Sequence, residues 1–472
     1  MFKNRRQSGA IAFQSASHFQ GNCTMNRWYL RLMLVCLFMY PSMLAAAETA
    51  PLSMSEAVHL ADKQNPKISA AISGVSAAEH KITQARSGYL PQVNFTETYG
   101  HTTNPMWAFG TRLNQKIITQ QDFDPDRLNH PNAIDNFNSA VSVEWPVYHG
   151  GQIQIGLEQA KWNKSAQELF LSRTRQEVTA QTATAYTDAL MAQRQLDVIQ
   201  KALETAQKHL TMIQTRYQSG LVVKSDVLRT EVHIADLEQK QIQAQSHIAI
   251  AMAVLNATMG EAGGNQWQLT TSLEKGPSIA TPLKDWIDLA ESNRPDMRNM
   301  AIQEQLAEAD VKKAKGAHLP QVNLMGNYEV NSQDFRNSGD NYTIGAMMRI
   351  NIYSGDRLSA QTQEAEAMHS KVQAMRSELA SGIEVQTRQA FLEAQSAWNR
   401  IQVSETAVAQ ANENLKIVRD RYENGLLTLV SLLDAEVASQ YAETNRYKAL
   451  HDYTIARIQL LLAAGALDTD FK

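Results

Sequence analysis

The side chains most able to do chemistry are spread along this sequence rather than gathered into a site. Histidines that could bind metal lie near predicted strands or on predicted helices, without a zinc or copper spacing: His101, His130, His149, His209, His233 and His247. His209 is expected on a solvated helix flank. There is no serine nucleophile elbow or His-Glu-x-x-His pattern, and no catalytic carboxylate pair stands out among the helix-surface acids. The sequence predicts no enzyme and no resident metal or cofactor.

A glycine cluster is the one feature that could suggest a nucleotide site. Gly150, Gly151 and Gly156 match neither the Walker nor the Rossmann pattern. Their place between a predicted strand and a predicted helix indicates an ordinary turn.

The first 47 residues indicate export. After a candidate start at Met25 come two arginines, an apolar run over 32–40 and an alanine triplet at 45–47, which together form a secretory signal. Both cysteines, Cys23 and Cys36, lie in this leader, so disulfides, thiolate metal sites and cysteine nucleophiles are excluded from the mature chain.

Charge and hydropathy narrow the class further. The leader holds five of the 44 basic residues and none of the 48 acidic ones, which leaves a mature net charge of −9. Such an acidic chain is a poor nucleic-acid binder. Beyond Glu48 no stretch approaches the length of apolar sequence that a transmembrane helix needs.

The predicted helices and strands, which would position any functional site, occur twice along the chain. The motif Leu90–Asn94 recurs as Leu319–Asn323, and Arg216–Leu221 recurs as Arg421–Leu426. The offset falls from 229 to 205 between these motifs because the first half carries an insertion, roughly at 104–135. The chain is therefore two copies of one unit.

Each copy begins with two helices. In the first copy Ser53 or Ser55 caps a helix, and Pro66 starts the next one, which Gly88 ends. The second copy has the same pair over 282–293 and 295–315.

Apolar and polar residues then alternate with the period of a β-strand. Strands are predicted over 91–102, 136–147, 321–330 and 341–352. One apolar and one polar face suit a barrel with lipid outside and water inside, although a half-buried soluble sheet alternates in the same way. Four strands cannot close a useful pore, so a barrel requires several chains.

A very long helix follows each strand pair. The segments 150–218 and 355–423 lack proline, and each would make a rod of roughly 100 Å. Return helices are predicted over 224–258 and 428–463. A 3–4 spacing marks a coiled-coil seam in each rod: Leu196, Ile199, Leu203, Ala206, Leu210, Ile213 and Tyr217, and Ile401, Ser404, Val408, Ala411, Leu415, Val418 and Tyr422. Such rods must pack against their antiparallel partners and against other chains.

The turns between these helices are the best candidates for function. Gly220 and Gly425 are expected to have positive φ. Apolar residues that we expect to be exposed follow them: Leu221, Val222, Leu426 and Leu427. Exposed apolar residues at a helix tip favour a protein partner, although a simple hairpin turn is the alternative.

Taken together, these motifs resemble the TolC-like outer-membrane efflux family over essentially all of the mature chain. The residues that carry the resemblance are Leu90–Gln92, Pro146–Gly151, Arg216–Leu221, Asp226–Leu228, Arg421–Leu426 and Leu432–Ala435. Each motif alone is weak, whereas their order and double occurrence are specific.

The resemblance implies an α+β membrane protein that acts as a homotrimer. Each chain would give four strands to a twelve-stranded β-barrel in the Gram-negative outer membrane, continued by a long periplasmic α-helical barrel. The implied partners are a periplasmic adaptor (membrane fusion protein) and an inner-membrane pump, of the resistance–nodulation (RND) or ABC type. The implied function is a passive exit duct for efflux or type I secretion.

The resemblance also implies a gate at the periplasmic mouth. Family members bond a tyrosine of the second turn to an aspartate after the first, and the matching pair here is Tyr422 and Asp226. An arginine that makes a second link in some members is replaced by Leu427. Of two aspartates that ring the constriction, Asp434 is retained and Ser431 replaces the other. Three copies of Asp434 would favour cations.

Five regions are predicted: a leader and signal (1–47), a first repeat (48–260), an equatorial linker (261–281), a second repeat (282–464) and a tail (465–472). A soluble periplasmic coiled-coil adaptor or scaffold is the main alternative function. The cargo stays open between drugs, metal ions and secreted proteins, since the methionines suit helix seams as well as copper or silver efflux.

Overall fold

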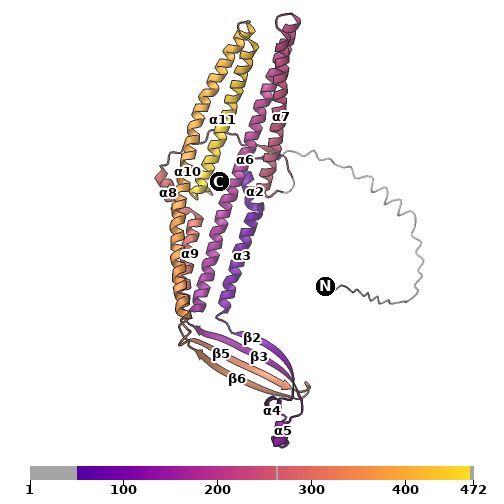
Figure 1. The fold of residues 1–472 in the computed structure, drawn as a ribbon, viewed down its shortest axis with the longest axis vertical. Helices are drawn as coiled ribbons and strands as arrows, with labels where there is room; N and C mark the ends of the chain where they lie inside the picture. Colours follow the sequence, from indigo (N-terminus) through magenta and orange to yellow (C-terminus); the bar gives the residue numbers. More distant parts are fainter. Residues whose placement is uncertain (1–49, 262–263, 468–472) are drawn as a thin grey trace, which may run out of the picture. The chain divides into compact units, whose positions relative to one another are not determined.

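The computed structural model describes residues 50–261 and 264–467, so the predicted leader and the end of the tail lie outside the described residues. The order of elements repeats along the chain. Two short helices, two antiparallel strands, a very long helix and a returning helix occur in the first half and again in the second (Figure 1). The predicted duplication is confirmed.

The short helices follow the predicted punctuation. They are α2 (Met54–Gln64), α3 (Pro66–Ser87), α8 (Leu283–Asn293) and α9 (Pro295–Gly316). Ser53 rather than Ser55 caps α2, because its hydroxyl accepts from the Glu56 amide while the Glu56 carboxylate accepts from the Ser53 amide. Helix α9 ends at Gly316, one residue beyond the predicted end at 315.

Four strands form one antiparallel sheet in the order β2-β3-β5-β6. They are β2 (Gln92–Thr102), β3 (Ile134–His149), β5 (Gln321–Ser332) and β6 (Ser338–Arg349). One apolar row across the sheet is Phe95, Val141, Tyr328 and Tyr342, and a row on the opposite face is Thr98, Asn138, Asn331 and Gly339. The sheet therefore has an apolar face and a polar face.

The last strand is shorter than predicted. Ile350 and Ile352 lie beyond the end of β6 at Arg349. The reason is the pairing, since Arg349 faces Gln321, the first residue of β5, and no partner strand continues past that pair.

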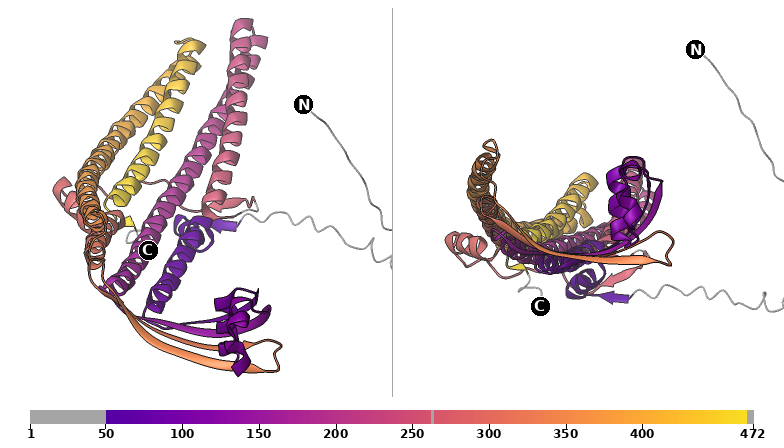
Figure 2. Two further views of the ribbon diagram at one scale, coloured as in Figure 1. Left: turned by 60° about the horizontal axis from the view of Figure 1, so that its bottom comes forward. Right: turned by 90° about the horizontal axis from the view of Figure 1, so that it is seen from below.

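A helical insert separates β2 from β3. It contains α4 (Pro105–Asn114), the 3₁₀ helix η1 (Gln120–Phe123) and α5 (Pro125–Asn129). Figure 2 shows this dark-purple insert stacked against one face of the curved sheet. The corresponding loop between β5 and β6 is only 333–337.

Two helical hairpins make up the rest of the structure. The long helix α6 (Gln152–Gln218) pairs with α7 (Lys224–Met259), and α10 (Arg357–Glu423) pairs with α11 (Leu429–Ala463). Helix α6 also packs on α11, which joins the two hairpins. The heptad-spaced Ile199, Ala206 and Ile213 are buried, as the seam predicted, whereas Tyr217 at the end of the predicted seam is exposed. Among the described residues no helix combines the length and hydropathy needed to cross a bilayer.

The largest cores lie where short elements cover the long helices. Strand β1 (Ala50–Leu52) pairs in parallel with β4 (Trp267–Leu269), and beside them Tyr186 of α6 packs in a buried cluster. The Tyr186 hydroxyl donates to the Leu52 carbonyl at 2.8 Å. Tyr453 lies in a second cluster with Leu273, from the segment between the repeats.

Candidate functional site

The two hairpin turns have nearly the same backbone. Gly220 has φ of 71° and Gly425 has φ of 73°, as predicted. The Leu221 amide donates to the Arg216 carbonyl at 2.9 Å, and the Leu426 amide does the same to Arg421 at 2.8 Å. These bonds end each helix as a left-handed glycine cap does.

The apolar residues after the turns divide into two kinds. Leu221 and Leu426 are 75% and 73% exposed. Val222 and Leu427 are half-buried, so the prediction that all four are exposed was wrong for these two. Val222 packs against a buried cluster near the tips, and its apolar surface is thereby partly covered within one chain.

That tip cluster contains residues of both hairpins: Ile213, Tyr422, Leu429, Leu432 and Leu433. Tyr422 is its aromatic member and is 5% exposed. The guanidinium carbon of Arg216 lies 5.4 Å from the centre of the Tyr422 ring, within cation–π range. Arg216 also donates to the Glu423 carbonyl at 3.1 Å. Arg216 of the first hairpin therefore fastens the end of α10.

The predicted gate residues are only partly brought together. Burial raises the pKa of Tyr422. Arg216 lowers this pKa, and the nearby Asp226 carboxylate raises it. Asp226 is half-buried in the first turn of α7. Over the described ranges no hydrogen bond joins the two side chains, and Arg216 is the partner of Tyr422 instead. The Tyr422–Asp226 gate stays a prediction.

The second predicted feature of the mouth lies on α11. Asp434 is exposed, whereas its neighbours Leu433 and Ala435 are buried. Ser431, which stands where other family members carry an aspartate, donates its amide to the Thr428 hydroxyl and so helps to start the helix. Asp434 is thus exposed to solvent in the single chain, and its role in selectivity stays a prediction.

His209 is not on a solvated flank, which corrects the sequence prediction. Its side chain is 12% exposed, and its Nδ1 lies 3.1 Å from Oε1 of Glu436, which is 11% exposed. The two atoms are near but not aligned for a hydrogen bond, and neither has another partner in the described structure. The contact between α6 and α11 buries both groups.

This burial changes how both groups titrate. Burial raises the pKa of Glu436 to about 7, with Arg419 opposing the shift. Burial also lowers the pKa of His209, with Arg419 and His233 acting in the same direction and Glu423 against it. Both shifts favour an uncharged pair at neutral pH.

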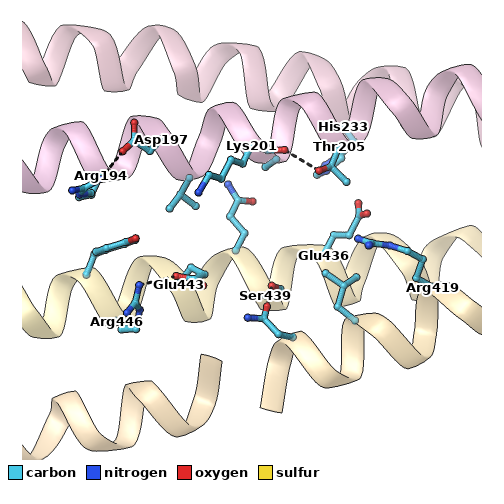
Figure 3. Close-up of a pocket in the computed structure, with 16 residues that line it drawn as sticks. Arg194, Asp197, Lys201, Thr205, His233, Arg419, Glu436, Ser439, Glu443 and Arg446 are labelled. Atoms are coloured by element: carbon cyan, nitrogen blue, oxygen red, sulfur yellow. Dashed lines mark hydrogen bonds and ion pairs between the residues drawn. The ribbon is translucent and has the colours of Figure 1, made fainter. Parts of the chain in front are cut away.

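Glu436 of this pair also lines a charged groove of about 470 Å³ (Figure 3). Its lining comes from all four long helices and includes Lys201, His233, Arg419 and Glu436. Sequence reasoning missed this polar cluster. The available signal was the spacing of Glu436 from Leu432, which places a carboxylate on the buried face of α11. Within the described ranges no group of three or more His, Cys, Asp or Glu could hold a metal ion.

An amphipathic four-stranded sheet joined to duplicated helical hairpins defines a class of outer-membrane channel protein. The chain matches the family model described as outer membrane efflux protein over residues 57–261 and 286–466. It belongs to the outer membrane efflux protein family.

The chain is similar to known proteins along most of their length, and this similarity supports the assignment. The chain is 22% identical to the alkaline protease secretion protein AprF of Pseudomonas aeruginosa, over 93% of this chain and 90% of AprF. It is 21% identical to the outer membrane protein TolC of Vibrio cholerae, over 88% and 91% of the two chains. Among solved structures, the CmeC outer membrane channel of Campylobacter jejuni superposes with a TM-score of 0.75 at 14% identity, covering 88% and 85%.

Family membership confirms the predicted function and location. The chain is an outer-membrane channel component of an efflux or secretion system in a Gram-negative cell. It has the duplicated fold of these channels, with a long helical part beside the sheet. Members of the family are channels rather than enzymes.

Proposed function

We propose that three copies of this chain form one passive duct through the outer membrane. The observation that carries the proposal is the sheet, because β2 and β6 each have a strand on one side only within the described structure. An exposed strand edge is a template for further pairing, and β2 and β6 run in opposite directions. Three such sheets joined edge to edge give twelve antiparallel strands and leave no free edge.

The faces of the sheet support the same assembly. Phe95 is 69% exposed, Tyr342 is 77% exposed and Ile344 is 81% exposed in the single chain, all on one face. Lipid would cover this face in the barrel. The opposite face carries Asn138 and Asn331, which suit a water-filled lumen.

The long helices also need neighbours. Val232 of α7 is 70% exposed and Val403 of α10 is 71% exposed. Helices from adjacent chains would cover these residues and close a periplasmic α-helical barrel around the duct. The same packing would leave Asp434 as a ring around the threefold axis.

The hairpin tips are the proposed docking site for a periplasmic adaptor. Leu221 and Leu426 directly follow Gly220 and Gly425 and are exposed, whereas Val222 and Leu427 are half-buried. An adaptor seated there would connect the duct to an inner-membrane pump, of the RND or ABC type. One relative is a protease secretion protein and another is a pyoverdine export protein, so both protein and small-molecule cargo fit this architecture.

Assembly is tested in outer-membrane vesicles with one cysteine in each edge strand. Thr96→Cys in β2 is combined in turn with cysteines at Asn341, Thr343 and Gly345 in β6. We expect a covalent trimer on oxidation for at least one pair, and none when Thr96→Cys is paired with a cysteine on the interior strand β5. Recovery of the chain with the soluble periplasm, as an adaptor or scaffold would behave, would refute the proposal.

Docking and gating are tested separately in the assembled channel. Leu221→Glu with Leu426→Glu should abolish capture of a periplasmic adaptor that binds the wild-type channel, while the trimer persists. Asp226→Ala and Tyr422→Phe should each raise the conductance in planar bilayers. Conductance equal to that of the wild type in both variants would show that these residues do not form the gate.

A further inference from the structure

The insert between β2 and β3 packs on the polar face of the sheet. Thr102 and Ile134 face each other as the last pair of the two strands, so residues 103–133 form the whole insert. Gln115 at the end of α4 is 2% exposed. Its amide donates to Oδ1 of Asn136 and to the Asp135 carbonyl, both at 2.8 Å. Asn136 lies on the polar face, in register with Gly100.

The start of β6 gives a second indication that the insert contacts the polar face of the sheet. Gly339 pairs with Asn331 and thus belongs to the polar face. A Cβ atom built on Gly339 would lie 2.2 Å from the Asn114 carbonyl oxygen, so the insert touches the backbone there. Asn341, two residues along the same face, donates to that carbonyl at 3.4 Å. The close approach at Gly339 leaves no room for a side chain beneath the insert.

The insert has its own helices and internal packing and is not an irregular loop. Asn104 caps α4 through the amides of Met106 and Trp107. Ala108 is fully buried, and the rings of Phe109 and Phe123 meet edge to face at 5.7 Å. Lys116 forms an ion pair with Asp340 at the rim of the sheet. The insert therefore holds α4 in a fixed position over the sheet.

A cavity of about 890 Å³ lies between α4 and the sheet. Most of its strand residues lie on the polar face: Thr98, Gly100, Thr102, Asn136, Asn138, Glu329 and Asn331. Met106 and Trp107 line it from α4, yet they are 85% and 70% exposed. These two large side chains are therefore solvent-exposed at a cavity on the polar side of the sheet.

We infer that the insert forms a second constriction, at the exit end of the duct. The inference rests on the proposed trimer, in which the polar face lines the lumen. Each chain then places α4 inside the bore, and three copies of Met106 and Trp107 narrow it from three sides. Apolar constrictions restrict ions and large solutes through pore radius and dewetting. Residues 103–133 would thus set the size of cargo that leaves and of solute that enters.

The test uses single cysteines, because the mature chain has none of its own. Trp107→Cys is labelled in planar bilayers with a bulky methanethiosulfonate added from the exit side. Asp334→Cys, in the exposed loop of the other strand pair, is the matched control. Both are made in an Asp226→Ala background, so that the predicted gate at the other end does not limit the current.

We expect the label to lower conductance by at least about twofold at Trp107→Cys and to leave Asp334→Cys unchanged. In the same Asp226→Ala background, replacement of residues 103–133 by the short loop 333–337 should raise conductance by about twofold and admit large antibiotics to cells. Complete labelling without a conductance change, together with a loop swap that conducts like its parent, would overturn the inference. If the wild-type chain forms no trimeric channel, that result would instead refute the proposed function on which this inference rests.

Discussion

The two hairpin tips share one backbone but differ in what surrounds them. The glycine φ angles agree within a few degrees, and each turn is closed by the same pair of hydrogen bonds from backbone amides. The tyrosines before the glycines nevertheless differ, since Tyr217 is 44% exposed and Tyr422 is 5% exposed. Equivalent residues of two copies therefore meet opposite environments.

The difference arises from contact between the hairpins. Arg216 reaches from the first tip to Tyr422 and to the Glu423 carbonyl, whereas its counterpart Arg421 is exposed. Further up the helices the same asymmetry recurs. Glu436 is buried between α6 and α11, while Glu231, at the same position in the first copy, is exposed. Duplication copies local geometry, and packing between the copies then makes their residues unequal.

The largest expected difference between the tips concerns the two tyrosines. Tyr422→Ala removes a buried ring and should lower the free energy of local opening at the tips by about 3 kcal/mol. Tyr217→Ala should cost under about 1 kcal/mol, since this ring is half in solvent. Amide hydrogen exchange of α6 and α10 near the turns measures both. Equal costs would mean that the tips are not asymmetric in solution.

The two glutamates give the next effect, and it depends on pH. Because the folded state raises the pKa of Glu436 to about 7, it keeps a proton that the unfolded chain releases above about 4.5. Stability from this group is therefore greatest at acid pH and falls as pH rises towards and past 7. Glu436→Gln should stabilise the hairpins at pH 8, on the order of 2–3 kcal/mol, and change little at pH 4.5.

His209 acts in the opposite direction, because its lowered pKa makes stability rise with pH just below 6.5. The comparison at pH 8 avoids its titration. Glu231→Gln is the matched control and should leave the pH dependence of thermal unfolding as it is in the parent. A parent-like pH profile in Glu436→Gln would contradict the buried, protonated glutamate.

The two turn glycines should behave alike, which tests the shared part of the comparison. Gly220 and Gly425 both have open space where a Cβ would stand, so only their positive φ opposes substitution. Gly220→Ala and Gly425→Ala should each cost about 1 kcal/mol of local stability. Hydrogen exchange at the two turns reports the costs, and a difference above about 1 kcal/mol would show that one turn is held by further contacts.

The smallest expected effect concerns charge at equivalent positions. Asp434 of α11 and Arg229 of α7 occupy the same place in the two copies, and both are exposed. Asp434→Asn should lower the preference of the channel for cations by about twofold, and Arg229→Gln should raise it slightly. Reversal potentials in a salt gradient measure both changes. An unchanged preference in Asp434→Asn would remove this residue from the constriction.

Much of the architecture could be read from local signals. Ser53, Pro66 and the turn glycines predicted helix limits because caps and positive φ depend on neighbouring residues alone. The strand period predicted the sheet and its two faces. The end of β6 was placed too late, since strand length depends on where the partner strand begins.

The sequence by itself determined the duplication, the kinds of elements and the tip turns, because these follow from periodicity and local backbone preference. Only the tertiary structure decided that Arg216 contacts Tyr422, that His209 and Glu436 are buried together, and that the insert lies on the polar face. These facts depend on which helix faces meet and on contacts between residues far apart in the chain. Local sequence patterns do not specify which distant residues come into contact. The packing of the helices in the folded protein sets these contacts.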